Sequence, residues 1–199
     1  MHQQPLIVSF YTNDWQYPEH ATRLREECAF LGLECKIEER QSTGEYLQNT
    51  CMKPFFIRDC LKLGRPILWI DVDGSIYQRP DYFLGNEENY DFQAKKMGPH
   101  RRRTWHVGTM WFNPTDIMKE FVEEWCKNSG ACSDESALEA TFRSKDWGLR
   151  TRDIPPEYFK LLLNKGRAAQ NDVICHRIST GESKRRQSYF ADKYEREVV

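Results

Sequence analysis

The sequence lacks several features that would assign a protein to a class at once. Its 199 residues contain no internal repeat, no low-complexity linker and no apolar run long enough to cross a bilayer. The apolar segment Pro5–Tyr11 is too short for the core of a signal peptide and has no basic leader before it. We therefore expect a soluble protein with cytoplasmic localisation.

Cysteine usage and charge exclude further classes. The seven cysteines are odd in number, scattered and without a Cys-x-x-Cys pair, so we expect neither a disulfide framework nor a structural zinc site. The formal net charge is −1, from 29 basic and 30 acidic residues. No global field would then draw the chain to nucleic acid or to an anionic membrane, and any such attraction has to be local.

Length and composition predict one domain. With 39% hydrophobic residues, a chain of this length can form one well-packed core but is short for two. We expect the domain to span residues 1–178, followed by a basic, charged C-terminal tail over residues 179–199. The tail contains the basic cluster Lys184, Arg185 and Arg186.

Strand and helix patterns alternate in the first half. Apolar, β-prone runs predict strands at Leu6–Tyr11, Leu33–Ile37 and Ile67–Ile70. Between the first two, apolar residues recur at helical spacing after Pro18, and Gly32 is placed to end that helix. This β-α-β-α-β order predicts an α/β fold whose ligands bind at the carboxyl ends of the strands.

The second helical segment has two start signals. Ser42 and Glu45 have the spacing of a capping box, and Pro54 is suited to begin a new helical turn. That turn would carry four residues inward: Phe55, Phe56, Cys60 and Leu61.

The second half is less regular. Strand candidates are Asp91–Ala94, His106–Phe112 and Val173–Cys175, the last of which would deliver His176. Thr115 and Ser133 are placed to cap two helices. A basic loop containing Arg101, Arg102 and Arg103 separates the first two of these strands.

The most informative motif is Asp71-Val72-Asp73-Gly74, which follows directly on the apolar run Ile67–Ile70. In a strand, residues i and i+2 point to the same face, so Asp71 and Asp73 would address one cation while Val72 faces the packed side. Carboxylates suit Mg²⁺ or Mn²⁺, which commonly keep coordination positions for substrate phosphates. The motif therefore predicts chemistry on a phosphorylated substrate.

An ordered set of segments resembles metal-dependent glycosyltransferases of the GT-A fold, whose D-x-D motif Asp71-Val72-Asp73 matches. The other matching segments are Lys53–Ile57, Val107–Asn113, Ser133–Glu135 and Cys175–Arg177. The resemblance implies a single-domain, Rossmann-like α/β fold with a mixed sheet flanked by helices. It also implies transfer of a sugar from a nucleoside diphosphate sugar, with a UDP-sugar expected, to an acceptor hydroxyl.

The resemblance implies roles for several residues. Asp71 and Asp73 would hold Mn²⁺ or Mg²⁺ on the donor diphosphate, and His176 would complete the metal site. Tyr11 and Thr12, at the end of the first strand, would contact the nucleoside.

Elementary chemistry adds candidates for the donor site. Tyr11 or Trp15 offers a flat face for a uracil-like base. Gly108, with Thr109 beside it, allows the backbone to approach the sugar because glycine has no Cβ. Lys53 is a candidate for neutralising donor phosphates.

Two acidic residues at a helix start are candidates for catalysis. Asp134 or Glu135 could orient sugar hydroxyls, act as general base on the acceptor, or shield one face of an oxocarbenium-like centre. Structural interpretations remain open: both carboxylates could simply favour the positive end of their helix, His176 could be a satisfied interior histidine, and Gly108 could mark a bulge.

A different enzyme class is the main alternative. Asp71-Val72-Asp73-Gly74-Ser75 also resembles the start of haloacid-dehalogenase-type phosphatases, in which Asp71 would be the nucleophile and Asp73 the general acid/base beside Mg²⁺. That motif normally closes the first strand of its fold, whereas a β-α-β-α unit precedes it here. Lys165 and Asp172 are the best candidates for the late residues such enzymes need.

A further alternative is a nucleic-acid-binding module without catalysis, using the basic loop and tail, but it leaves the acidic pair unexplained. Combining the two ideas gives a glycosyltransferase whose acceptor is DNA, such as a phage enzyme that modifies hydroxymethylated pyrimidines. Arg101–Arg103 and Lys184–Arg186 would then bind acceptor phosphates. Such an enzyme would work in the host cytoplasm.

Overall fold

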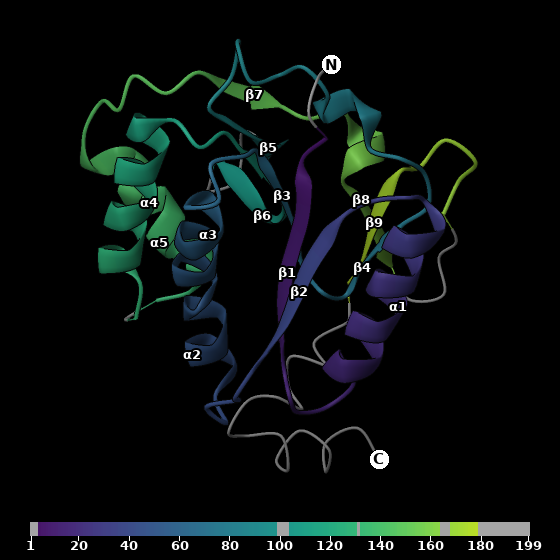
Figure 1. The fold of residues 1–199 in the computed structure, drawn as a ribbon. Coiled ribbons are helices and arrows are strands. Elements are labelled where there is room, and N and C mark those ends of the chain that lie inside the picture. Colours follow the sequence, from purple (N-terminus) through teal and green to yellow (C-terminus); the bar gives the residue numbers. More distant parts are fainter. Residues whose placement is uncertain (1–3, 99–103, 131, 164–167, 179–199) are drawn as a thin grey trace.

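The computed structural model describes residues 4–98, 104–130, 132–163 and 168–178. A six-stranded mixed sheet forms its centre, with helices on both faces and a small second sheet beside one face (Figure 1). The strand order of the large sheet is β2-β1-β3-β6-β5-β7, and that of the small sheet is β4-β9-β8. The predicted fold, a mixed α/β sheet flanked by helices, is confirmed.

The elements alternate in the first half and become irregular in the second. The strands are β1 (Leu6–Thr12), β2 (Cys35–Arg40), β3 (Ile67–Ile70), β4 (Gly74–Ile76), β5 (Phe92–Lys96), β6 (Trp105–Phe112), β7 (Thr151–Asp153), β8 (Lys160–Leu163) and β9 (Ile174–Ile178). The α-helices are α1 (Tyr17–Phe30), α2 (Tyr46–Cys51), α3 (Lys53–Leu61), α4 (Asp116–Asn128) and α5 (Asp134–Ser144). Two short 3₁₀ helices are η1 (Asp81–Phe83) and η2 (Pro156–Tyr158).

Strand pairing explains where the polar ends of the strands meet. β1 pairs in parallel with both β2 and β3, so these three strands end at the same edge of the sheet. β6 runs antiparallel to β3, with Ile70 opposite Thr109. The start of β6 therefore lies at the edge where β1 and β3 end, and residues at those three positions are brought together.

Two apolar clusters cover the two faces of the large sheet. On one face, the buried side chains of α3, α4 and α5 pack on alternate residues of β3 and β6, among them Trp69, Met110 and Phe112. On the other, α1 and the small sheet pack on Leu68, Ile70 and Trp111. This three-layer arrangement leaves the strand ends as the place where polar side chains gather (Figure 1).

Most expected elements are present, with local differences. β3 spans the predicted residues, while β2 begins at Cys35 rather than Leu33. Ser42 does not cap α2: Glu45 occupies the cap position, and the Ser42 hydroxyl donates to Asp14 at 2.6 Å. The prediction that Phe55 points inward is wrong, since it is 41% exposed.

Two caps and one strand also differ in detail. Ser133 caps α5 as predicted, because its Oγ accepts a hydrogen bond from the backbone N–H of Ser136. Thr115 stands at the cap position of α4, but its hydroxyl bonds Asp91 instead of the helix. His176 lies within β9 rather than after the strand.

Candidate functional site

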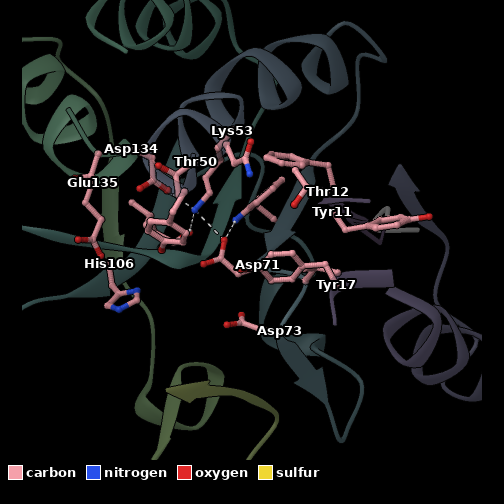
Figure 2. A pocket seen from close by; sticks show the side chains of 17 residues that line it. Tyr11, Thr12, Tyr17, Thr50, Lys53, Asp71, Asp73, His106, Asp134 and Glu135 are labelled. Carbon is pink, nitrogen blue, oxygen red and sulfur yellow. Dashed lines mark hydrogen bonds and ion pairs between the residues drawn. The ribbon is translucent and has the colours of Figure 1, made fainter. Parts of the chain in front are cut away.

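A pocket of about 330 Å³ opens where β1, β3 and β6 meet the starts of α1, α3 and α5 (Figure 2). Seven of the residues singled out in the sequence line it: Tyr11, Thr12, Lys53, Asp71, Asp73, Asp134 and Glu135. Among the other lining residues are Tyr17, Tyr46, Asn49, Thr50 and His106. The pocket lies at the carboxyl ends of the parallel strands, as the sequence predicts.

A tight turn, not a strand, brings the acidic pair together. β3 ends at Ile70, and the backbone N–H of Gly74 donates to the carbonyl of Asp71 at 2.7 Å. Both carboxylates line the pocket, and Val72 is buried against the α1 side of the sheet. The expectation that the two aspartates share one face of a strand is therefore wrong in its geometry, although they do meet in one pocket.

The turn requires glycine at position 74 because a side chain there would have no space. A Cβ at this position would lie 2.7 Å from Cγ2 of Ile70, 2.9 Å from the carbonyl oxygen of Asp71 and 3.0 Å from Cε1 of His176. The first two separations are shorter than real Cβ contacts and the third is tighter than most, so a side chain here would displace the turn that carries both carboxylates.

Lys53 connects the acidic pair to α5. Its Nζ lies 2.8 Å from Oδ1 of Asp71 and 2.5 Å from Oδ2 of Asp134, and the side chain is almost fully buried. Burial would lower the pKa of Lys53, but the charges of Asp134 and Asp71 outweigh it and raise the pKa. Lys53 is therefore a buried cation whose charge is balanced within the protein.

Asp71 is held as an anion by its neighbours. Burial would raise its pKa, but the ammonium of Lys53, with smaller contributions from His176 and from the Trp69 indole N–H, holds the pKa below its usual value. The indole donates to Oδ1 of Asp71 at 2.8 Å, the same oxygen that pairs with Lys53.

The start of α5 places two carboxylates in different surroundings. Asp134 is 5% exposed and tied to Lys53, whereas Glu135 is only half-buried and lines the pocket. Figure 2 shows both side chains pointing from the helix start toward the pocket. Asp134 is thus built into an ion-pair network, and Glu135 is the more accessible of the two.

His176, Gly108 and Thr109 lie behind the pocket wall. Nε2 of His176 is 2.7 Å from the hydroxyl of Thr109, and burial lowers the pKa of His176 to about 4, although the charge of Asp71 opposes the shift. Gly108 accepts a hydrogen bond from the backbone N–H of Asp71 at 2.8 Å. A Cβ on Gly108 would lie 3.1 Å from Phe159 and 3.2 Å from His176, so this glycine allows the histidine to approach.

Of the three residues expected to contact the nucleoside, two line the pocket and one does not. Tyr11 and Thr12 line the pocket, and the guanidinium of Arg25 lies 5.3 Å from the centre of the Tyr11 ring. Trp15 is not among the lining residues. It adopts a left-handed backbone (φ 52°), unusual for a bulky residue, and packs edge-on against Tyr17.

Tyr17 and His106 are lining residues that sequence reasoning missed. Burial and the charges of Asp73 and Asp71 raise the pKa of Tyr17, which keeps its phenol protonated beside the acidic pair. Nδ1 of His106 accepts from the backbone N–H of Gly108 at 3.1 Å, so a neutral ring carries its proton on Nε2. The period of two along the strand could have found His106, because it shares a face with Gly108.

The donor set suits a hard cation in part. Asp71 and Asp73 supply carboxylate oxygens to one pocket, and Mg²⁺ is often held by one or two carboxylates plus substrate phosphates. Within the described ranges, no group of three or more His, Cys, Asp or Glu side chains is arranged to hold a metal ion. The oxygen ligands that this pocket offers a cation are thus those of two aspartates, while Nε2 of His176 is engaged by Thr109.

The basic residues predicted to bind an acceptor lie outside the described part of the chain: Arg101, Arg102, Arg103, Lys184, Arg185 and Arg186. The described structure resumes at Thr104, whose backbone N–H donates to Glu139 of α5 at 2.7 Å. In the described residues no helix is both long and apolar enough to span a bilayer.

Comparison with known families gives one match that covers most of the chain. Residues 12–195 match the model of a family described as nucleotide-diphospho-sugar transferase. A search of curated protein sequences found no match.

Several solved structures that match this fold are glycosyltransferases. One, described as involved in the glycosylation of the major capsid of PBCV-1, is 15% identical with a TM-score of 0.63, and the match covers 98% of both chains. GlyE of Streptococcus pneumoniae TIGR4 is 12% identical with a TM-score of 0.59, covering 89% of this chain and 56% of that one. The galactosyltransferase LgtC, solved with donor and acceptor sugar analogs, is 11% identical with a TM-score of 0.51, covering 96% and 94%. At these identities the likeness shows the fold, which is that of GT-A glycosyltransferases.

Proposed function

The chain belongs to the nucleotide-diphospho-sugar transferase family and is a glycosyltransferase, and we propose that it binds a UDP-sugar through a divalent cation held by Asp71 and Asp73. The transferred sugar would go to an acceptor hydroxyl. Neither the phosphatase nor the non-catalytic alternative is favoured by the family match, and Asp71 follows the third strand of the sheet rather than the first.

The charge of the pocket carries the proposal. Among the described residues that line it, four are acidic (Asp71, Asp73, Asp134 and Glu135) and one, Lys53, is basic. A diphosphate entering this pocket would be repelled, because the one cation is already compensated by two carboxylates. A bound Mn²⁺ or Mg²⁺ would reverse the local charge and let the donor bind.

Each aspartate would contribute differently to that site. Asp73 lines the pocket from the turn that follows β3, so it would supply one ligand. Asp71, with Oδ1 shared by Lys53 and Trp69, would contribute its other oxygen. His176 as a third ligand would first exchange its hydrogen bond to Thr109. The cation, when bound, supplies Lewis-acid stabilisation of the departing diphosphate.

The pocket wall suggests where the two halves of the donor lie. Tyr11, Thr12 and Tyr17 would contact the nucleoside, since they line the β1 side of the pocket and carry flat rings and a hydroxyl. The sugar would then lie toward His106 and Glu135, on the side of α5 and β6. In Figure 2 the acidic pair lies between these two groups of side chains, where the diphosphate would be.

Glu135 is the better candidate to act on the acceptor. Its side chain is more exposed than that of Asp134, and it lines the pocket at the start of α5. Glu135 could accept the proton of the acceptor hydroxyl or orient a sugar hydroxyl. Asp134, which is tied to Lys53, would instead hold the site together.

DNA is the acceptor suggested by the basic clusters of the sequence. Replacing Arg101, Arg102 and Arg103 with glutamine should raise the KM for hydroxymethylated DNA steeply and reduce its dependence on salt. An unchanged KM would remove DNA as the acceptor while leaving donor binding untouched.

A thermal-shift panel tests the proposed donor. UDP, CDP, ADP and GDP are added at equal concentration, with Mn²⁺ or with EDTA, because a ligand that binds only the native state raises its apparent stability. Of all these combinations, we expect only UDP together with Mn²⁺ to stabilise the protein. Stabilisation by another nucleotide would correct the nucleoside, and stabilisation by none would refute the proposal.

A further inference from the structure

We infer that Arg23 and Glu27 of α1 are positioning residues that set the place of the Asp73 carboxylate by clamping the backbone of the turn that carries it. The inference rests on the proposed cation site. Neither residue lines the pocket or has a role in the donor site described above.

The contacts of Arg23 are concentrated on the turn. Its Nη2 donates to the carbonyl of Asp73 at 3.2 Å and to that of Gly74 at 3.0 Å. Its Nη1 donates to Nδ1 of His20 at 3.3 Å, and its Nε lies 3.5 Å from Oε1 of Glu27. The guanidinium is therefore held on α1 at two points while it grips two consecutive carbonyls of the turn.

Glu27 extends the clamp by two residues. Its Oε2 accepts from the backbone N–H of Ile76 at 2.8 Å. The side chain is 22% exposed, and burial raises the pKa of Glu27 although this backbone bond and Arg23 oppose the shift. Partial burial of a carboxylate is costly unless the group is hydrogen-bonded, and the bond from Ile76 offsets that cost.

Together the side chains of Arg23 and Glu27 make the backbone hydrogen bonds that a neighbouring strand would otherwise make with β4. β4 pairs on one edge with β9, where Ser75 is opposite Cys175. The carbonyl of Gly74 and the N–H of Ile76, two residues apart, point to the other edge, which in the described sheet no strand covers. Arg23 and Glu27 satisfy that edge, so the backbone that follows Asp73 is held from both sides.

This arrangement has a consequence for Asp73. The carboxylate extends from a turn in which Gly74 has no room for a side chain and in which the carbonyls of Asp73 and Gly74 are bound by a charged donor. Loss of the clamp would let the turn move, so the Asp73 carboxylate would be present but no longer held in its position. Outer-shell groups that orient metal ligands commonly contribute about ten-fold or more to metal affinity.

The test compares Arg23→Met with Arg65→Met. Arg65 is a matched control because its Nη2 also donates to a backbone carbonyl, that of Gln4 at 2.9 Å, and its Nη1 pairs with Glu34. It lies just before β3, at the end of the sheet opposite the pocket. Mn²⁺ binding is measured by electron paramagnetic resonance of the free ion, without nucleotide and with UDP, beside urea unfolding of each variant.

We expect Arg23→Met to weaken Mn²⁺ binding about ten-fold both with and without UDP, and Arg65→Met to leave it unchanged. Equal Mn²⁺ affinity in the two variants would overturn the inference. A loss seen only with UDP would also overturn it, because Arg23 would then act on the phosphates rather than on the turn.

A second, more conservative pair of variants provides the test if Arg23→Met does not fold. Arg23→Lys keeps one charged donor near the two carbonyls, so it should restore part of the Mn²⁺ affinity, and Arg65→Lys is its control. If Arg23→Met does not fold, equal Mn²⁺ affinity of Arg23→Lys and Arg65→Lys overturns the inference. If the wild-type protein binds no Mn²⁺, the proposed cation site fails, a result distinct from failure of the clamp.

Discussion

The ammonium of Lys53 lies 2.8 Å from Oδ1 of Asp71, joining α3 to the turn that follows β3. The same ammonium pairs with Asp134 at the start of α5. One buried cation therefore connects three segments far apart in the sequence. The described residues that line the pocket carry more negative than positive charge, which is the basis of the proposed need for a metal ion.

Removing that cation should destabilise the fold. Lys53→Met leaves the carboxylates of Asp71 and Asp134 without their partner, and we expect a loss of about 3 kcal/mol in the free energy of unfolding. Lys62→Met is the control, because Lys62 is 66% exposed and its pair with Asp59 should contribute less than about 1 kcal/mol. Urea unfolding measures both, and equal losses would contradict the network.

The glycine of the acidic turn should not tolerate a methyl group. Gly74→Ala would place Cβ 2.7 Å from Ile70, so we expect a loss of about 1–3 kcal/mol and weaker binding of UDP with Mn²⁺. Gly98→Ala is the control, since an added Cβ there meets no atom within 4 Å. Calorimetric unfolding and nucleotide titration measure the two effects. Stability and binding equal to those of the Gly98→Ala control would contradict the steric argument.

The two carboxylates of α5 should separate by their effects. Glu135→Gln should lower kcat by about 100-fold, with the free energy of unfolding unchanged, if Glu135 accepts the acceptor proton. Asp134→Asn should lower both kcat and the free energy of unfolding, because Lys53 loses a charged partner. Transfer rates and urea unfolding are measured on each variant. A Glu135→Gln enzyme with full kcat would exclude Glu135 as the base.

Acid sensitivity should arise partly outside the pocket. Hydrogen bonds from Arg150 hold the pKa of Asp91 below its usual value, against burial. Because the folded pKa is lower than the unfolded value of about 3.9, this contribution to stability is present above that value and is lost as the pH falls through the folded pKa.

Asp91→Asn should therefore flatten the fall in stability as the pH drops below about 4. Asp116→Asn is the control, since that carboxylate is 96% exposed. The midpoint of urea unfolding is followed against pH for both variants, and an unchanged slope in Asp91→Asn would contradict the assignment.

The local patterns that predicted the fold are those with strong periodicity or end signals. The apolar run Ile67–Ile70 is buried on both faces, so its sequence reads as a strand without ambiguity, and Gly32, with φ 64°, follows the end of α1 as expected. The small sheet was missed because β4 has only three residues and its pairing partner β9 is a hundred residues further along the chain.

The site shows the same division. Asp71 and Asp73 were predictable because two acids follow a buried strand, but the turn that unites them depends on the fit around Gly74. The pairing of Lys53 with Asp134 could not be predicted, since no local pattern encodes an ion pair between two helices. Tyr17 reaches the pocket through tertiary packing of α1, which no local pattern encodes, whereas the period of two along β6 could have found His106.

The most direct test of the cation site is a calorimetric titration of UDP into the wild-type protein and into Asp73→Asn, with Mn²⁺ or with EDTA. Because four acidic side chains and one lysine line the pocket in the described part of the chain, wild-type affinity should be at least about 100-fold higher with Mn²⁺. Asp73→Asn should lose most of that gain. UDP binding that is equally tight in EDTA would contradict the account.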